Sequence, residues 1–297
     1  MKILLTGATG FIGSHLLSQL VEQSGENTVL ALCRNIPITT LPQVNWIEVD
    51  LSETNWTSKL PNEKFDIIIH LAQSKNYRRF PSHTNDIFNV NVKSTLELAD
   101  WGIRQNVSHF LFASTGNVYN FTNYIHCEED QCEPETMYGA SKLSAETLLK
   151  PFSPFMNILV VRLFGVYGPK QTNSMLSGII HRFMIDEEIV LASNVGVRTN
   201  PIYIEDCVEL LHQLIIENKI TGLRIINIGG SEIIDLRKVV SCLEAFTGKT
   251  ALTRITSDAP KQLVGSIDRL RKLLPFKEKV CFEEGLYRTF NFLKLHS

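Results

Sequence analysis

Long apolar runs, an excess of basic charge and clustered metal ligands are all missing from this sequence. No stretch of its 297 residues approaches the roughly 20 consecutive apolar residues that a membrane-spanning helix needs. Its formal net charge of −2 gives no general attraction to nucleic acid or to an anionic membrane. We therefore predict a cytoplasmic protein with neither a membrane nor a nucleic-acid partner.

The cysteines do not form clusters in the sequence either. Of the six cysteines, only Cys127 and Cys132 lie close in sequence, and no group of His and Cys has the spacing of a zinc site. This pattern predicts reduced thiols and no metal centre. The N-terminal "MKILLTGATG" runs from a short apolar stretch straight into glycines, which indicates a first strand rather than a signal peptide.

Short apolar runs alternate with helix-length segments through the first half of the chain. Runs such as "KILLT", "TVLALC", "DIIIHLA", "HFLFAS" and "NILVVRLF" are typical of strands in a parallel sheet covered on both faces. The alternation predicts an α/β fold, a doubly wound parallel Rossmann sheet with a smaller, discontinuous C-terminal substrate-binding lobe. We place the dinucleotide-binding domain at 1–165 with a return segment near 199–228, and the lobe at 166–198 and 229–297.

The stretch "TGATGFIG" places Gly7, Gly10 and Gly13 between the first expected strand and the first expected helix. Glycines allow a tight turn and let backbone N–H groups approach a pyrophosphate. The helix N-terminus adds unpaired donors and a favourable dipole. Strand, glycine turn and helix follow in the order that a dinucleotide site requires, so the sequence predicts a bound dinucleotide.

The end of the second expected strand bears on which dinucleotide binds. NAD binders usually place an acid there to hold the ribose 2′-OH, but this chain has Cys33 followed by Arg34. A guanidinium can hold a 2′-phosphate, so we predict NADP(H) as the preferred cofactor, with NAD(H) possible. The alternatives are that Arg34 is solvated or stacks on adenine. Asp50, which closes "NWIEVD", is either an acceptor for the adenine amino group or a strand-end cap.

Tyr138 and Lys142 in "YGASK" lie four residues apart and would share one face of a helix. A phenol has a reference pKa of about 10 and needs a nearby cation to relay protons at neutral pH. Lys142 is expected to supply that cation and to bind ribose hydroxyls, while a nicotinamide carries hydride. Thr115 closes an expected strand, where such sheets present ligands, and its hydroxyl can hold a substrate oxygen. The alternative role for Tyr138 is an aromatic packed on the core.

With these residues together, the chain resembles the extended short-chain dehydrogenases/reductases, in the group of NAD(P)-dependent nucleotide-sugar epimerases, dehydratases and reductases. The resemblance extends over nearly the whole chain and rests on the motifs "TGATGFIG", "VDLS", "HLA", "NVNVKST", "STGNVY", "YGASK", "RLFGVYGP", "NPIYIED", "NIGG" and "FEEGL". It implies a catalytic set of Thr115, Tyr138 and Lys142. It also implies a homodimer built through a four-helix interface by the segments near 86–105 and 138–150.

The resemblance further implies a set of cofactor contacts, to which the arguments above add Arg34, Tyr138 and Lys142. Those it implies are Gly7, Gly10, Phe11, Ile12, Gly13, Asp50, Leu51, Leu71, Ala72 and Asn91. From the residues alone, Asn91 could equally be a helix cap or a solvated polar residue.

The residues after Thr115 bear on the reaction. The 4,6-dehydratases that resemble this chain follow the hydroxyl residue with an Asp-Glu pair, because eliminating water needs one group to remove a proton and another to deliver one. This chain has Gly116 and Asn117 there, and an amide does not titrate. We therefore predict no dehydratase activity, which leaves ketone reduction, or oxidation followed by return of hydride to the opposite face.

A reductase and an epimerase would use the same three residues and would differ in how they use the cofactor. An epimerase recovers its oxidised cofactor in every cycle, whereas a reductase consumes a reduced one, often NADPH. Arg34 therefore favours a reductase of a keto-sugar nucleotide over a 4-epimerase that uses bound NAD. A non-catalytic dinucleotide-binding sensor or scaffold also stays open, as does a reductase of a small non-nucleotide carbonyl.

Substrate contacts are predicted from Thr115, Asn117 and Arg198. The resemblance implies that an arginine near 198 grips the nucleotide diphosphate, and the alternative is a surface or interdomain ion pair. Gly165 stands where the family often has an Asn that touches the sugar or phosphate, which leaves room for a different or larger substrate. The segment after "DIIIHLAQ" forms either the mouth of the substrate site or a solvated basic loop; its residues are Lys75, Tyr77, Arg78 and Arg79. His70 and His109 flank expected strands, which favours core or surface roles.

Overall fold

The computed structural model of the chain describes residues 1–22, 27–39, 41–217 and 220–296. The chain forms two compact units, each discontinuous in sequence. The first comprises Met1–Tyr119, Gln131–Arg162 and Leu211–Ile226, and the second comprises Asn120–Asp130, Leu163–Leu210 and Asn227–Ser297. Compared with the predicted boundaries, the second unit also includes segment 120–130. The segment that returns to the first unit begins at Leu211 rather than near 199.

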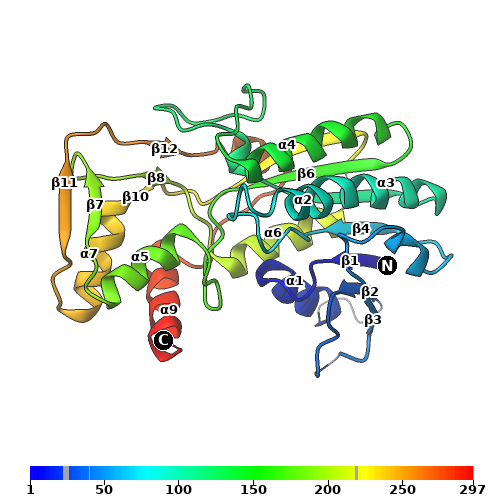
Figure 1. Ribbon diagram of the computed structural model, residues 1–297, viewed down its shortest axis with the longest axis horizontal. Helices are drawn as coiled ribbons and strands as arrows, with labels where there is room; N and C mark the ends of the chain where they lie inside the picture. Colours follow the sequence, from blue (N-terminus) through cyan, green and yellow to red (C-terminus); the bar gives the residue numbers. More distant parts are fainter. Residues whose placement is uncertain (23–26, 40, 218–219, 297) are drawn as a thin grey trace. The chain divides into compact units, whose positions relative to one another are not determined.

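A seven-stranded sheet in the order β3-β2-β1-β4-β5-β6-β9 is the framework of the first unit (Figure 1). β1 pairs in parallel with β2 on one side and with β4 on the other, so the strand order reverses at β1. That order belongs to a doubly wound Rossmann sheet and confirms the predicted fold class. The strands are β1 (Lys2–Thr6), β2 (Thr28–Cys33), β3 (Val44–Glu48), β4 (Ile67–His70), β5 (His109–Thr115), β6 (Asn157–Leu163) and β9 (Leu223–Ile228).

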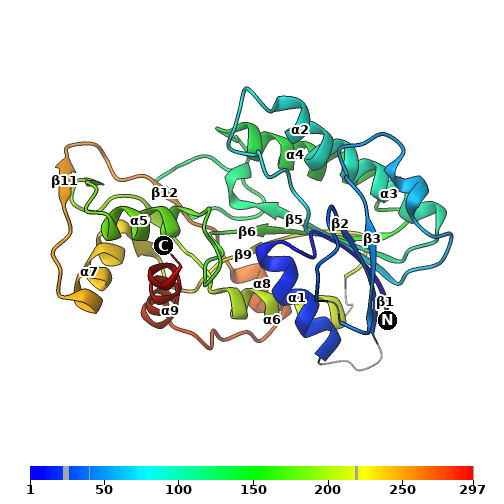
Figure 2. The same ribbon diagram turned by 60° about the horizontal axis from the view of Figure 1, so that its bottom comes forward.

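Helices cover both faces of this sheet. On one face lie α1 (Phe11–Glu22) and α6 (Ile204–Glu217), and on the other lie α2 (Thr84–Phe88), α3 (Ser94–Arg104) and α4 (Met137–Leu149) (Figure 2). The helix expected near 86–105 is a continuous helical stretch in which a π-helical turn, η2 (Asn89–Lys93), joins α2 to α3. Short 3₁₀ turns are η1 (Trp56–Lys59), η3 (Gly116–Val118) and η4 (Lys150–Phe152).

Burial on both faces explains why the strands read as continuous apolar runs. Leu4, Ile68 and Phe112, on three neighbouring strands, are fully buried, and Phe65 and Phe110 join the same cluster. Full burial of such a side chain contributes about 1.5–3 kcal/mol relative to leaving it exposed. This core holds the strand ends at which the predicted site residues lie.

The second unit contains small sheets and helices. β8 (Arg198–Thr199) lies between β10 (Ile234–Asp235) and β12 (Gln262–Leu263), and β7 (Ile189–Ala192) pairs in parallel with β11 (Thr253–Thr256). α5 (Met175–Met184), α7 (Leu236–Thr247) and α9 (Phe282–Leu295) pack on one another, and α8 (Asp268–Leu273) is a short additional helix. Asp235 caps α7 by accepting a hydrogen bond from the Lys238 N–H at 2.8 Å.

In the described part of the chain, every helix is too short or too polar to cross a bilayer. Among the same residues, no group of three or more His, Cys, Asp or Glu side chains could hold a metal ion. No disulfide joins the six cysteines, all of which lie among the described residues. On the helices of the predicted dimer interface, Phe88, Leu96 and Leu148 are exposed. The homodimer stays a prediction.

Candidate active site

Five of the predicted site residues lie at or just beyond the carboxyl ends of neighbouring strands. Gly7, Arg34 and Asp50 follow β1, β2 and β3. Ala72 follows β4, and Thr115 ends β5. The carboxyl ends of parallel strands meet at one edge of a sheet, and doubly wound folds bind ligands at that edge where the strand order reverses. The topology therefore brings these five residues to the edge that is suited to a dinucleotide.

Close backbone approaches shape the glycine turn. Gly7 has φ +73°, a left-handed conformation that favours glycine, and a Cβ there would lie 2.8 Å from the backbone nitrogen of Ala72. A Cβ on Gly13 would lie 2.0 Å from the carbonyl oxygen of Gly7. The Gly10 N–H donates to that same carbonyl at 2.9 Å, directly before α1. Side chains at positions 7 and 13 would fill the turn, so these residues fit a pyrophosphate held by backbone N–H groups at the N-terminus of α1.

Other residues expected to contact the cofactor surround this turn. A Cβ on Gly7 would also meet the carbonyl carbon of Leu71 at 2.8 Å, so the segment after β4 packs directly on the turn. Phe11 and Ile12 are half-buried in the first turn of α1, and Leu51 is buried after β3. Their contacts with a dinucleotide stay predictions.

Asp50 and Arg34 interact electrostatically. Asp50 accepts hydrogen bonds from the Ser52 N–H at 2.8 Å and from the Ser52 hydroxyl at 2.7 Å. Partial burial raises the pKa of Asp50, but the two Ser52 donors and the Arg34 charge together lower it below its ordinary value. Arg34 itself is exposed. Asp50 therefore acts as an ionised cap of the turn after β3, and its contact with adenine stays a prediction.

Tyr138 lies in the first turn of α4, and Thr136 caps this helix by accepting from the Gly139 N–H at 3.1 Å. The Tyr138 hydroxyl donates to Oε1 of Gln73 at 2.9 Å. Loss of water around the phenol raises the pKa of Tyr138 above its ordinary value, and a side-chain hydrogen bond with Thr115 lowers it in part. Tyr138 and Thr115 thus meet at the end of β5. Sequence reasoning missed Gln73, because its pairing with Tyr138 spans 65 residues.

Lys142 is buried in the same helix, with 1 % of its surface exposed. Its Nζ donates to the Ala113 carbonyl at 2.8 Å and lies 4.7 Å from the centre of the Phe112 ring. Burial lowers the pKa of Lys142 to about 7, and the Glu146 carboxylate raises it in part. Lys142 was expected to lower the pKa of Tyr138. The protein alone does not show this effect, because loss of water raises the pKa of the phenol more than any neighbouring charge lowers it.

The turn after β5 orients Thr115. Its hydroxyl oxygen accepts hydrogen bonds from the backbone N–H and from Nδ2 of Asn117, at 3.2 and 3.0 Å. A Cβ on Gly139 would lie 2.1 Å from the Asn117 carbonyl oxygen, so α4 approaches this turn with no room for a side chain. Sequence reasoning missed Gly139. The available signal was a glycine inside a helix, where it costs about 1 kcal/mol relative to alanine.

Asn91 is fully buried in the π-helical turn, and both ends of its amide bind the protein. Its Oδ1 accepts from the Ser74 N–H at 2.8 Å, and its Nδ2 donates to the Ser141 hydroxyl at 2.9 Å. Ser141 donates in turn to the Tyr138 carbonyl at 2.8 Å. Asn91 is therefore neither a cap nor a solvated residue, because it joins the segment after β4 to the start of α4.

A second tyrosine packs beside Tyr138. The ring centres of Tyr77 and Tyr138 are 4.8 Å apart, and the guanidinium of Arg78 lies 5.3 Å from the centre of the Tyr77 ring. Lys75 and Arg79 are exposed. Of the predicted basic segment, Tyr77 and Arg78 lie beside the candidate proton relay.

His70 ends β4 and is buried between two threonine hydroxyls. Its Nδ1 lies 2.6 Å from Oγ1 of Thr6, and its Nε2 lies 2.9 Å from Oγ1 of Thr95. Thr95 donates its own proton to the Asn91 carbonyl, so its oxygen accepts from Nε2–H and Nδ1 accepts from Thr6. Burial, and then the Lys142 charge, lower the pKa of His70 to about 3. His70 is thus a neutral core residue with both ring nitrogens hydrogen-bonded.

The remaining substrate-side candidates belong to the second unit. Arg198 lies on β8 with an exposed side chain, and its contact with a diphosphate stays a prediction. Gly165 has φ +58°, and a Cβ there would lie 3.4 Å from Pro201. Asn also tolerates this left-handed region, so Gly165 removes an amide without requiring a different backbone.

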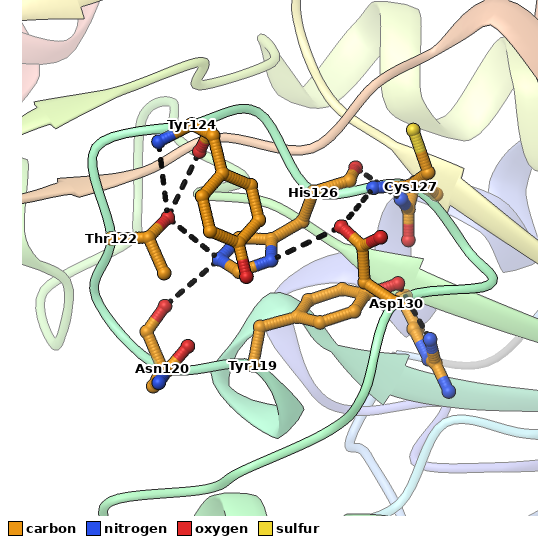
Figure 3. Close-up of polar contacts among 9 residues, drawn as sticks. Tyr119, Asn120, Thr122, Tyr124, His126, Cys127 and Asp130 are labelled. Carbon is orange, nitrogen blue, oxygen red and sulfur yellow. Dashed lines mark hydrogen bonds and ion pairs between the residues drawn. The ribbon is translucent and has the colours of Figure 1, made fainter.

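Figure 3 shows a polar cluster of the second unit that sequence reasoning also missed. The imidazole of His126 is fully buried, with Nε2 2.9 Å from the Asn120 carbonyl oxygen and Nδ1 3.6 Å from the Asp130 carboxylate. Asp130 also accepts from the Cys127 N–H at 2.9 Å. Partial burial, and then the Asp130 charge, raise the pKa of the Cys127 thiol, which argues against a nucleophilic role for it. The cluster folds this segment on itself.

Comparisons with known proteins add three findings. Residues 3–229 match the family model described as the NAD dependent epimerase/dehydratase family. An uncharacterized UDP-glucose epimerase, YtcB, from Bacillus subtilis (strain 168) is 26% identical over 312 residues, covering 99% of this chain and 98% of the relative. The crystal structure of UDP-glucuronic acid 4-epimerase from Bacillus cereus, in complex with UDP-glucuronic acid and NAD, is 27% identical with a TM-score of 0.87, and the match covers 100% of both chains.

Proposed function

Because the chain belongs to the NAD dependent epimerase/dehydratase family, we propose that it is an NAD-dependent 4-epimerase of a UDP-linked hexose or hexuronate. One observation carries the proposal: the phenol of Tyr138 and the hydroxyl of Thr115 meet at the sheet edge that also carries the glycine turn. The relatives described above support the UDP-sugar class and the reaction at C4. The proposal adopts the epimerase that the sequence left open and sets aside the predicted preference for a reductase.

The choice of NAD over NADP(H) rests on the solved relative rather than on Arg34. The reductase preference depended on Arg34 as a 2′-phosphate ligand, and in the structure its charge acts on Asp50. The solved relative at 27% identity contains NAD. We therefore assign NAD, and the predicted preference for NADP(H) has no support beyond the residue type.

The proton relay is assigned to Tyr138, and Lys142 is assigned its expected part as the ammonium that binds the ribose hydroxyls and favours the phenolate. When bound, the oxidised dinucleotide supplies the hydride acceptor, and its positive nicotinamide ring favours the phenolate. Tyr138 takes the proton of the sugar 4-hydroxyl and later returns it to the same oxygen, once the 4-ketone presents its opposite face. Because the Thr115 oxygen accepts two hydrogen bonds from Asn117, its own proton is directed away from that residue. In the protein alone this proton faces the Tyr138 oxygen, and a substrate oxygen held beside Tyr138 would receive it instead.

The same turn argues against elimination of water. Gly116 is buried and Asn117 carries an amide that binds Thr115, so neither residue can exchange a proton with the sugar. A 4,6-dehydratase needs two more titratable groups, one that removes a proton from the sugar and one that delivers a proton to the leaving hydroxyl. We therefore keep the prediction that the protein is not a dehydratase.

A turnover assay tests the proposal. The protein is incubated with UDP-glucuronate or UDP-glucose and NAD, without added reductant, and the products are resolved by chromatography and NMR. We expect conversion to the C4 epimer. Tyr138→Phe should lower turnover by about 10²–10⁴-fold while leaving NAD affinity unchanged, because it removes only the relayed proton. Tyr287→Phe, an exposed tyrosine of the second unit, is the matched control and should retain wild-type turnover.

Three outcomes would contradict the epimerase assignment. Turnover that depends on stoichiometric NADPH would support the reductase. Tight NAD binding without turnover of any UDP-sugar would support the sensor or scaffold. Turnover of a small carbonyl compound that free UDP does not inhibit would support a small non-nucleotide substrate.

A further inference from the structure

α4 and the end of β5 are joined by three pairings. Tyr138, Lys142 and Glu146 are spaced four residues apart and share one face of α4. They engage three consecutive residues of β5. Thr115 hydrogen-bonds with Tyr138, the Ala113 carbonyl accepts from Lys142, and the Ser114 hydroxyl donates to Glu146. The third pairing lies beyond the catalytic set that the sequence predicted.

Glu146 is a buried carboxylate with a complete set of partners. It is 2 % exposed, and it accepts from Arg162 through Nη2 at 2.7 Å and through Nε at 3.2 Å. Arg162, on β6, also donates to the Tyr119 hydroxyl at 2.6 Å. A buried ion pair adds little net stability compared with apolar residues of the same size. Its presence one helical turn after Lys142 in α4 calls for another explanation.

We propose that Glu146 is a positioning residue which, acting through Lys142, keeps that side chain an ammonium and holds it in register with the end of β5. This inference rests on the proposed function, because the catalytic role of Lys142 does. Arg162 and Ser114 fix the carboxylate, whose charge acts on Lys142 from one helical turn further along α4. Glu146 does not touch the reacting atoms.

The charges around Lys142 support this assignment. Burial lowers the pKa of Lys142 to about 7, and Glu146 supplies the opposing charge on the same helix. His70, on β4, is neutral above its own pKa of about 3, and Tyr138 is neutral as a phenol. Arg162 is paired with Glu146. Removing the carboxylate should therefore lower the pKa of Lys142 below 7, so that most of the side chains lose their proton at neutral pH.

The experiment measures Lys142 directly. The titration midpoint of its ¹³Cε and ¹⁵Nζ signals is followed by NMR in the folded protein without substrate, with Lys142→Met used for assignment. In Glu146→Gln we expect the midpoint to fall by about one pH unit, which is a tenfold loss of ammonium at a fixed alkaline pH. The alkaline limb of kcat for the proposed reaction should move to lower pH by the same amount. Glu146→Asp retains the charge and should restore most of the shift.

Two control variants separate the charge from a structural effect. Ser114→Ala removes a donor to Glu146 but no charge, and should lower the melting temperature without moving the midpoint. Asp100→Asn removes an exposed carboxylate that pairs with Arg104 and should change neither quantity. If Glu146→Gln fails to fold because Arg162 is left uncompensated, Glu146→Gln/Arg162→Met removes both charges and should show a lowered midpoint, with a smaller shift because a cation is lost as well.

Two results would overturn the inference. One is a wild-type midpoint in the folded Glu146→Gln protein or in the double variant. The other is a Glu146→Asp protein that titrates like Glu146→Gln, since shape rather than charge would then be decisive. The midpoint does not depend on substrate. Absence of UDP-sugar turnover would therefore contradict the proposed function while a lowered midpoint still supported the effect of Glu146 on Lys142.

Discussion

His70 and Lys142 are buried against the same aromatic ring, and yet they hold protons very differently. The His70 ring stacks on Phe112 with ring centres 5.8 Å apart, and the Lys142 ammonium lies 4.7 Å from the centre of that ring. Burial lowers both pKa values, to about 3 for His70 and to about 7 for Lys142. His70 is therefore neutral throughout the physiological range, whereas Lys142 titrates within it.

The difference lies in the ordinary pKa values, which are 6.5 for the imidazole and 10.5 for the ammonium, because burial lowers both by a similar amount. His70 meets hydroxyls from Thr6 and Thr95, which satisfy a neutral imidazole and offer no charge. Lys142 has a carboxylate one helical turn away, and that charge opposes part of the effect of burial. The comparison teaches that, for equal effects of burial, the type of side chain decides which buried group near the candidate site can exchange a proton at neutral pH, while the partners adjust that pKa.

The largest effect is expected from Lys142→Met. Turnover should fall by about 10²–10⁴-fold, because the relay loses its cation. The same change should also stabilise the fold, since it removes an ammonium whose burial lowers its pKa below the ordinary value. The folded pKa of about 7 lies below the ordinary value of 10.5, so the gain should be full below pH 7 and should shrink as pH rises towards 10.5. Kinetics and urea unfolding across this range test both effects.

Lys150→Met is the matched control for this prediction, because Lys150 directly follows α4 and is exposed. It should leave turnover unchanged and shift stability by less than about 0.5 kcal/mol. A Lys142→Met protein less stable than the wild type would contradict the view that this charge is buried at a cost.

His70→Leu tests the other member of the comparison. It leaves the Thr6 hydroxyl without its acceptor in the core, so the free energy of unfolding should fall by about 1–3 kcal/mol. The pH dependence of kcat should keep its wild-type midpoints, because His70 does not titrate in that range. His109→Leu, at a half-buried histidine of the same sheet, should cost less. A moved midpoint in His70→Leu would assign His70 a part in proton transfer.

A smaller effect is expected in how His70 makes the free energy of unfolding depend on pH. The folded pKa of His70 is about 3 and its ordinary value is 6.5, so between these values the unfolded chain binds the additional proton. The contribution of His70 is full above pH 6.5 and is lost as pH falls towards 3, at about 1.4 kcal/mol per pH unit. Denaturant unfolding across this window should show a shallower slope in His70→Leu. Equal slopes would show that His70 does not remain neutral in the fold.

The smallest effect is expected at Arg34, whose side chain is exposed rather than buried. Arg34→Ser should raise the pKa of Asp50 slightly towards its ordinary value, because one of the charges that lower it is lost. Stability should change by less than about 1 kcal/mol, as is usual for exposed charges. NAD affinity should stay within about twofold of wild type. A large loss of NADPH binding with NAD binding unchanged would restore the predicted preference for NADP(H).

The framework of the protein could be predicted from its sequence because the signals are local. A parallel sheet covered on both faces requires apolar runs, and runs such as "TVLALC" and "HFLFAS" give β2 and β5. The close approaches at Gly7 and Gly13 require glycine itself, so the turn is visible as a motif. Tyr138 and Lys142 are placed together by helical spacing alone.

What the sequence could not predict depends on contacts between distant residues and on burial. Gln73 reaches Tyr138 across 65 residues, and Arg162 reaches Glu146 between a strand and a helix. Neither pairing has a local pattern. The direction of the Tyr138 pKa shift was also missed, because spacing identifies the nearby cation but not the loss of water around the phenol. The NADP(H) preference relied on the residue type at position 34 alone, whereas the solved relative at 27% identity contains NAD.

The most direct test of the proposed function follows the hydrogen at C4 of the sugar. UDP-glucuronate or UDP-glucose deuterated at C4 is incubated with the protein and a catalytic amount of NAD, and the product is analysed by NMR and mass spectrometry. We predict a C4 epimer that retains the deuterium at C4 and takes up no hydrogen from solvent on carbon. A dehydrated product with solvent hydrogen on carbon, or a product whose C4 hydrogen comes from added NADPH, would contradict the epimerase.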